Sequence, residues 1–141
     1  MELTNSLGYL LNVSARLIKQ DLDNQLKKYQ ITTSQWYVMK VLSGCGELTQ
    51  VEITKKINSD QATSGAIIER MIKNELLQKR RHEVDRRVYI VSLTDYGKSI
   101  ISELEMLAQD TNERALTGIA GEDAEHLYEV LHQIINNLKE G

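Results

Sequence analysis

The stretch that decides the fold is residues 49–72, TQVEITKKINSDQATSGAIIERMI. Thr49 and Glu52 have the spacing of a capping box, which predicts that a short helix begins here. Residues 58–60, Asn-Ser-Asp, then supply a polar turn and an N-cap for a second helix that begins near Gln61. The apolar residues at helical spacing are Val51, Ile53 and Ile57 in the first helix and Ala62, Ile67, Ile68, Met71 and Ile72 in the second. Two helices joined by a tight polar turn are the pattern of a helix-turn-helix.

The first turns of the second helix carry short polar or small side chains. A helix that enters the major groove of DNA must leave room there for base edges, because long apolar side chains would block the approach. We therefore predict that Gln61, Thr63 and Ser64 contact DNA. Gly65 and Ala66 would allow the backbone to approach closely. The alternative is that the three polar residues only cap the helix.

Residues 79–94, KRRHEVDRRVYIVSLT, place a β-forming run after a basic cluster. Residues 88–91 favour a strand, and a turn at residues 83–86 separates it from a preceding strand at residues 79–82. We predict two short antiparallel strands with a basic tip. This is the arrangement of the wing that follows the recognition helix in a winged helix-turn-helix.

The charge of this wing is opposite to that of the rest of the chain. The whole chain carries a net charge of −3, whereas residues 79–87 hold five basic and two acidic residues, a net +3 that leaves −6 elsewhere. Because binding to phosphate needs cations, we predict that Arg81, Arg86 and Arg87 contact DNA. Arg86 and Arg87 are expected at the phosphate backbone or in the minor groove. The alternative is a solvated charged hairpin. Asp85 either orients one of the arginines or only forms the turn.

Further helices are predicted on both sides of this lobe. An apolar stripe over residues 3–29 predicts a helix too long to bury its stripe in one small domain, which favours cover by a second subunit. A capping-box pattern at residues 32–35 begins a helix that ends at residues 44–46, Gly-Cys-Gly. The last two helices are predicted to begin at residues 94–95 and 122–123. The expected fold class is mainly α with a small two-stranded β-wing.

The composition fits one cytoplasmic domain. A length of 141 residues suits a single domain, and the absence of proline leaves the chain free to be largely helical. No basic segment followed by a long apolar run opens the chain, and no 18 consecutive residues are apolar, so we expect neither a signal peptide nor a membrane span. Cys45 is the only cysteine, which suits a reducing compartment.

The chain resembles the MarR family of bacterial winged-helix transcription regulators over essentially its whole length. The motifs that carry the resemblance are Asp85-Arg86-Arg87, Val91-Ser92-Leu93-Thr94 and Gly97 at the wing and the helix after it, and Leu48-Thr49-Gln50-Val51-Glu52-Ile53 at the opening of the helix-turn-helix. The resemblance implies a single regulator domain, residues 1–141, with dimerisation helices at both ends. The DNA-binding lobe would cover about residues 32–93, and the dimerisation helices about residues 1–29 and 95–140.

The resemblance also implies a function. Members of the family bind palindromic double-stranded operators as homodimers, with a recognition helix in the major groove and a wing arginine in the minor groove. Many are repressors that small aromatic or phenolic anions release from DNA. This chain departs from the family pattern at Glu75, which stands where a glycine usually precedes the aliphatic pair, so we expect Asn74 to take the left-handed position. Gly65 and Ala66 stand where relatives often have threonine and arginine, so no operator sequence is carried over.

Other chemistry has less support. No Gly-rich phosphate loop, nucleophile signature, paired carboxylates or metal-ligand spacing is evident, so we expect neither an enzyme nor a metal or cofactor. The three histidines do not have metal-ligand spacing, and Cys45 has no cation close in sequence that would favour a redox role. The rival function is a winged-helix protein-interaction module that does not bind DNA, which the acidic body favours.

A ligand site is a further hypothesis. Arg16, Trp36 and Met39, with Tyr9, could line a cavity between the first two helices, where Arg16 would pair with a carboxylate. The alternative, which we favour, places the apolar residues in the core and Arg16 at the surface.

Overall fold

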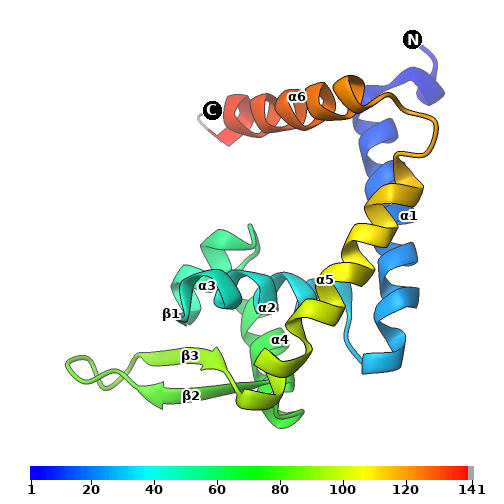
Figure 1. Ribbon diagram of the computed structural model, residues 1–141. Helices are drawn as coiled ribbons and strands as arrows, with labels where there is room; N and C mark the ends of the chain where they lie inside the picture. Colours follow the sequence, from blue (N-terminus) through cyan, green and yellow to red (C-terminus); the bar gives the residue numbers. More distant parts are fainter. Residues whose placement is uncertain (140–141) are drawn as a thin grey trace.

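The computed structural model describes residues 1–139. The elements in chain order are α1 (Leu7–Leu26), α2 (Thr33–Cys45), β1 (Glu47–Thr49), α3 (Gln50–Lys56), α4 (Gln61–Lys73), β2 (Leu77–Arg81), β3 (Tyr89–Leu93), α5 (Asp95–Ala115) and α6 (Gly121–Lys139). Short 3₁₀ turns, Leu3–Asn5 and Lys27–Tyr29, flank α1, so the helix predicted over residues 3–29 is divided into three pieces. Figure 1 shows a lobe of short helices and strands, with α1 and α5 packed together beside it. The predicted fold class is confirmed.

Local capping explains where the helices of the lobe begin. The hydroxyl of Thr32 accepts the backbone N–H of Gln35 (3.2 Å), while the amide oxygen of Gln35 accepts the N–H of Thr32 (3.2 Å). Thr49 and Glu52 form the same reciprocal pair at the start of α3, and Thr94 caps α5. These predicted helix starts are confirmed, because a capping box is specified by residues that are neighbours in sequence.

The sheet contains the two predicted strands of the wing, β2 and β3, and a third strand, β1, that was not predicted. β3 lies in the middle, with β1 and β2 antiparallel on either side of it. Val91 of β3 pairs with Leu48 of β1 on one side and with Lys79 of β2 on the other. β1 is only three residues long, too short for an alternating pattern to reveal it. It forms because β3 offers it an open edge.

The core lies where α2, α4 and the sheet meet the ends of α1 and α5. Most of it is aliphatic, as a chain without phenylalanine requires. Its buried apolar members are Leu22, Leu26, Ile31, Trp36, Val38, Met39, Leu42, Leu48, Ile53, Ile68, Met71, Leu76, Leu77, Val91, Leu93, Ile100 and Leu104.

The end of α4 corrects one prediction. The left-handed residue is Glu75, with φ of 64°, and not Asn74, whose φ is −87°. The N–H of Glu75 donates to the carbonyl of Ile72 (3.0 Å), and the N–H of Leu76 donates to that of Met71 (2.9 Å), which is a Schellman motif. Leu76 is buried. Packing of this leucine therefore decides which residue adopts positive φ, against the backbone preference of glutamate.

The start of α5 is joined tightly to the start of β2. The N–H of Thr94 donates to the carbonyl of Leu76 (3.1 Å), and the hydroxyl of Thr94 donates to the carbonyl of Glu75 (2.6 Å). A Cβ atom at Gly97 would lie 2.5 Å from the carbonyl oxygen of Leu76, a backbone atom that cannot move aside. This close approach requires glycine and fixes the angle at which α5 leaves the lobe.

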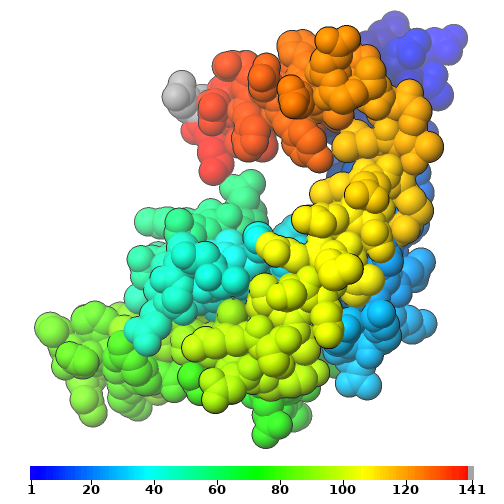
Figure 2. Space-filling model, viewed as in Figure 1, coloured from blue at the N-terminus to red at the C-terminus, as the bar shows by residue number. Residues whose placement is uncertain are grey.

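The last helix has no buried residue and stands apart from the lobe, with open space between them (Figure 1 and Figure 2). Its exposed apolar side chains are Leu127, Tyr128, Val130, Ile135 and Leu138, and those of the N-terminal segment include Leu3, Leu7, Leu10, Leu17 and Ile18. Residue 140, the predicted limit of the C-terminal dimerisation segment, lies outside the described residues, as does residue 141. No helix within residues 1–139 is long and apolar enough to cross a membrane.

Candidate nucleic-acid interface

The packing of α3 against α4 buries one of the predicted DNA contacts. Ser64 has no exposed surface. Its hydroxyl contacts that of Thr54 on α3 and donates to the backbone carbonyl of Asp60 (2.9 Å). The predicted contact between Ser64 and DNA is therefore wrong, because the side chain joins the two helices. Its small size suits this position, where a larger side chain would force α3 and α4 apart.

The other two polar residues at the start of α4 are exposed. Thr63 donates its backbone N–H to Asp60 Oδ1 (2.8 Å) and its hydroxyl to Asp60 Oδ2 (2.9 Å). These two hydrogen bonds hold the pKa of the Asp60 carboxyl below its usual value. The hydroxyl of Thr63 thus keeps its lone pairs free to accept. Gln61 is the first residue of the helix, and its side chain reaches back to α3.

The base of the wing is held by basic side chains stacked on an aromatic ring. Lys79 Nζ lies 4.6 Å from the centre of the Tyr89 ring, and the Arg81 guanidinium lies 5.2 Å from it. Arg81 Nη1 also donates to the backbone carbonyl of Arg86 (2.7 Å), across the wing. Arg81 therefore supports the loop that carries Arg86 and Arg87, whatever contact it makes with DNA.

The tip of the wing is organised by two side chains. His82 Nδ1 accepts the backbone N–H groups of Val84 and Asp85, both at 3.1 Å. Asp85 Oδ1 accepts from the N–H and from Nε of Arg87, again at 3.1 Å each. Both roles considered for Asp85 are thus observed, since it closes the turn and also orients Arg87. The side chain of Arg87 remains 91% exposed. Arg86 is exposed beside it.

A groove of about 420 Å³ lies between the helix-turn-helix and the wing. It is lined by Thr49, Gln50, Val51, Gln61, Arg87, Val88 and Tyr89. The structure thereby brings together Gln61 and Arg87, two predicted DNA contacts that are distant in sequence. Gln61 offers an amide suited to base edges, and Arg87 offers a cation suited to phosphate or a narrow minor groove. The groove therefore combines the two kinds of contact on which sequence-specific DNA binding depends.

Comparison with known proteins gives the family. The family model of the transcriptional regulators SarA/Rot matches residues 21–104. The HTH-type transcriptional regulator YwoH of Bacillus subtilis, itself uncharacterized, is 32% identical over 130 residues, which cover 90% of this chain and 94% of that protein. The chain belongs to the SarA/Rot family of winged-helix transcription regulators. The HTH-type transcriptional repressor NicR of Pseudomonas putida is 29% identical over 137 residues, 96% of this chain and 86% of the repressor.

Solved structures agree on the fold. The chain matches MarR of E. coli in complex with operator DNA with a TM-score of 0.85 at 21% identity, covering 91% of this chain and 92% of MarR. It matches BpsR of Bordetella bronchiseptica with a TM-score of 0.88 at 22% identity, covering 95% of this chain and 96% of BpsR. The resemblance to MarR regulators that the sequence indicated is confirmed in the fold. The family model and the two HTH-type relatives show that the chain is a DNA-binding transcription regulator.

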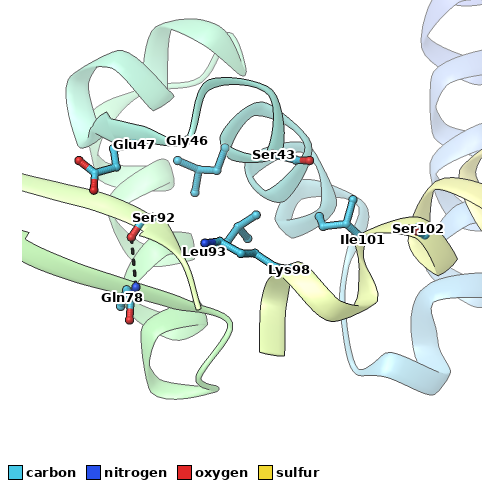
Figure 3. Close-up of a pocket in the computed structure, with 10 residues that line it drawn as sticks. Ser43, Gly46, Glu47, Gln78, Ser92, Leu93, Lys98, Ile101 and Ser102 are labelled. Atoms are coloured by element: carbon cyan, nitrogen blue, oxygen red, sulfur yellow. Dashed lines mark hydrogen bonds between the residues drawn. The ribbon is translucent and has the colours of Figure 1, made fainter. Parts of the chain in front are cut away.

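The predicted ligand cavity between the first two helices is not formed by the residues proposed for it. Trp36 is 5% exposed and Met39 is fully buried, and both belong to the hydrophobic core, whereas Arg16 is exposed on α1. These three residues therefore follow the favoured alternative, which placed the apolar residues in the core and Arg16 at the surface. A different groove of about 440 Å³ lies between α2, the sheet and the start of α5 (Figure 3). Its polar lining includes Lys98, whose side chain reaches from α5 toward the sheet (Figure 3).

Two residues of these grooves escaped the sequence analysis. Gln50 lies beside Gln61 at the first position of α3, and Lys98 lies on the first turns of α5. The equal placement of Gln50 and Gln61, each directly after an N-cap, was a signal that could have found the first of them. Lys98 carries no such signal, because its groove is built from three segments that are distant in sequence.

The contact between Asp85 and Arg87 makes a testable prediction about the wing. The Arg87 side chain and then its backbone N–H hold the pKa of the Asp85 carboxyl below the ordinary value. Because the folded-state pKa is lowered, this contact stabilises the wing at neutral pH and is lost as the pH falls through that pKa. We expect a carboxyl-carbon NMR titration to place Asp85 below an ordinary aspartate, and Arg87→Ala to return it toward the ordinary value. Arg86→Ala is the matched control, and an equal effect of both variants would contradict the assignment.

Proposed function

We propose that this regulator acts as a homodimeric repressor and binds a palindromic operator, with each subunit placing α4 in the major groove and its wing at the adjacent minor groove. The observation that carries the proposal is the shared groove of Gln61 and Arg87 between the helix-turn-helix and the wing. Gln61 and Thr63 are exposed at the end of α4 that would face base edges. Arg86 and Arg87 are exposed on the projecting loop, and Arg81 supports that loop.

The division of the chain into a lobe and dimerisation helices is part of the proposal. We assign residues 32–93 to the DNA-binding lobe, and residues 1–29 with α5 and α6 to the dimer. A helix of 19 residues with an exposed apolar face is only marginally stable alone in water. In the proposed dimer, a second copy of the chain covers this face, and the terminal helices of the two copies pack together. The open space in Figure 2 leaves room for that copy.

The cellular compartment of the protein and its lack of enzymatic activity are also part of the proposal. A regulator of transcription works where the DNA is, so we propose a cytoplasmic protein that binds rather than catalyses. The rival function, protein interaction without DNA binding, has weaker support because MarR of E. coli, a solved protein with this fold, binds operator DNA. The two differ in salt dependence, since contacts with phosphate release counterions and weaken steeply as salt is added.

The wing assignment predicts the effect of removing both arginines. We expect Arg86→Ala with Arg87→Ala to weaken binding roughly 100-fold or more to a duplex that the wild-type protein selects from a random pool, because such contacts are worth about 1–3 kcal/mol each. The slope of binding against salt should become shallower, and the dimer should stay intact. Fluorescence anisotropy at two salt concentrations measures both effects. Lys27→Ala with Lys28→Ala removes the same charge from another part of the chain and should change little. Operator affinity retained by the arginine variant would refute the wing assignment.

The dimer assignment predicts the effect of losing the last helix. A chain truncated from Glu122 onward is expected to be monomeric or to aggregate in sedimentation velocity, because the apolar faces of α1 and α5 lose their cover. The full-length variant Leu127→Glu with Val130→Glu tests the same face without truncation and should dissociate the dimer. Glu129→Ala, on the same helix, is its control. A truncated chain that sediments as a well-behaved dimer would contradict the assignment.

We also propose that a small aromatic anion relieves DNA binding. BpsR is a protein whose DNA binding 6-hydroxynicotinic acid regulates. In the present chain, the groove of Figure 3 joins the lobe to α5 and has the size of a small aromatic ligand, with Lys98 available to pair with a carboxylate. A ligand there would act on the junction between the sheet and α5, which sets how each lobe is held relative to the dimer.

This proposal is tested by titrating the protein–DNA complex with 6-hydroxynicotinate, benzoate and 2-hydroxybenzoate. We expect at least one of them to raise the dissociation constant for DNA by about 5- to 150-fold, the usual range of coupling between two sites. Lys98→Ala should remove most of this effect and leave DNA binding without ligand unchanged. Lys19→Ala on α1 serves as the control. If none of the three acids changes DNA binding, or if Lys98→Ala responds like the wild type, the ligand site is elsewhere.

A further inference from the structure

Two glutamine side chains are paired at the mouth of the helix-turn-helix. Gln50 is the first residue of α3, and Gln61 is the first residue of α4. Nε2 of Gln50 donates to the backbone carbonyl oxygen of Gln61 (3.3 Å) and to Oε1 of the Gln61 side chain (3.1 Å). Both hydrogen bonds come from the same amide group, so the side chain of Gln61 is held by its neighbour before any DNA arrives.

These two hydrogen bonds fix which way round the amide of Gln61 lies. A backbone carbonyl can only accept, so the nitrogen of the Gln50 amide must face it. The same nitrogen also donates to the side chain of Gln61, so the atom of Gln61 that faces it must be the amide oxygen, which accepts. Nε2 of Gln61 is therefore turned away from Gln50, and within residues 1–139 neither of its hydrogens is donated to another group. Oε1 keeps a second lone pair, because a carbonyl oxygen can accept two hydrogen bonds.

The space for this arrangement is provided by Gly65. A Cβ atom at this position would lie 2.9 Å from Nε2 of Gln50, and 3.7 Å from the amide carbon. Gly65 follows Gln61 by four residues and so lies on the same face of α4. A larger residue would displace the Gln50 amide from its position over the helix. Glycine in a helix interior costs stability relative to alanine, so its presence here fits a requirement for space.

We propose that Gln61 reads an adenine in the major groove, and that Gln50, seated over Gly65, is the positioning residue that orients its amide. Adenine presents an acceptor, N7, beside a donor, the N6 amino group, and a glutamine amide matches both at once. With the orientation found here, Nε2 donates to N7 and the remaining lone pair of Oε1 accepts from N6. Guanine presents two acceptors at the same edge, so its O6 would oppose Oε1. The inference rests on the proposed function, which places α4 in the major groove.

The test compares the sequences that the full-length protein and its variants enrich from a pool of random duplexes. The wild type is expected to select adenine at one fixed position of each half-site, preferred about 5- to 150-fold over other bases. Gln61→Ala should lose the preference at that base pair alone. Gln50→Ala and Gly65→Ala should lower it at least 5-fold at the same base pair and leave the other positions unchanged.

Three further variants separate positioning from structure. Gln50→Glu keeps the shape of the side chain but removes its donors, and is expected to lose the adenine preference as Gln50→Ala does. Gly44→Ala and Gln20→Ala are controls of the same substitution types, and no heavy atom lies within 4 Å of a Cβ placed at Gly44. Gly65→Ala should not lower the thermal unfolding midpoint, because alanine favours a helix. A loss of base preference in a chain of full stability is a result that a merely structural role would not give.

The failure of this inference differs from the failure of the proposed function. Full adenine preference in both Gln50→Ala and Gly65→Ala would overturn the positioning role. A wild-type preference for guanine at the position lost in Gln61→Ala, or no change in Gln61→Ala at all, would overturn the role of Gln61. A wild-type protein that enriches no sequence would overturn sequence-specific binding itself, and this inference with it.

Discussion

The pairing of β3 with two strands at once is the constraint on which the rest of the lobe depends. β1 ends at Thr49, which is also the N-cap of α3, so the pairing of Thr49 with Ile90 sets where the helix-turn-helix begins. On its other edge β3 pairs with β2, as in Arg81 opposite Tyr89, and this pairing carries the wing. β3 thus holds β1 and β2, which are distant in sequence, at a fixed spacing from each other. The shared groove between helix-turn-helix and wing exists because of this register.

A second constraint joins the lobe to the long helix that leaves it. Thr94 caps α5 and at the same time bonds the carbonyls of Glu75 and Leu76, so the helix start, the end of α4 and the start of β2 form one unit. Gly97 packs so closely against the Leu76 carbonyl that no side chain would fit between them. Along α5, Thr111 and Arg114 bond Asp21 of α1, and these contacts hold the pKa of Asp21 below its ordinary value. The start of α5 is therefore bonded to the end of α4 and the start of β2, and its later turns are bonded to α1.

The sequence predicted what local chemistry decides and missed what distant packing decides. Capping boxes and the turn before α4 were predictable because each involves residues within one helical turn. The short strand β1 was not, since it forms only against β3. The choice of Glu75 over Asn74 as the left-handed residue follows from the burial of Leu76, and the burial of Ser64 follows from the fit of α3 on α4. These packing effects were not visible in a polar, turn-forming stretch.

Contacts between distant segments also affect how the interface achieves specificity. Three of the five wing cations form ion pairs within the lobe. Arg87 pairs with Asp85 but stays 91% exposed, whereas Lys79 pairs with Glu69 (2.9 Å) and Arg80 with Glu47 (2.8 Å). The wing therefore offers less to phosphate than a count of its charges suggests. The rest of the chain is acidic and repels DNA at longer range. Both effects weaken sequence-independent binding, which depends on counterion release. Contacts with base edges, which do not depend on net charge, then account for a larger share of the difference between operator and other DNA. A regulator with few free cations can thus be selective with a small number of well-oriented base contacts.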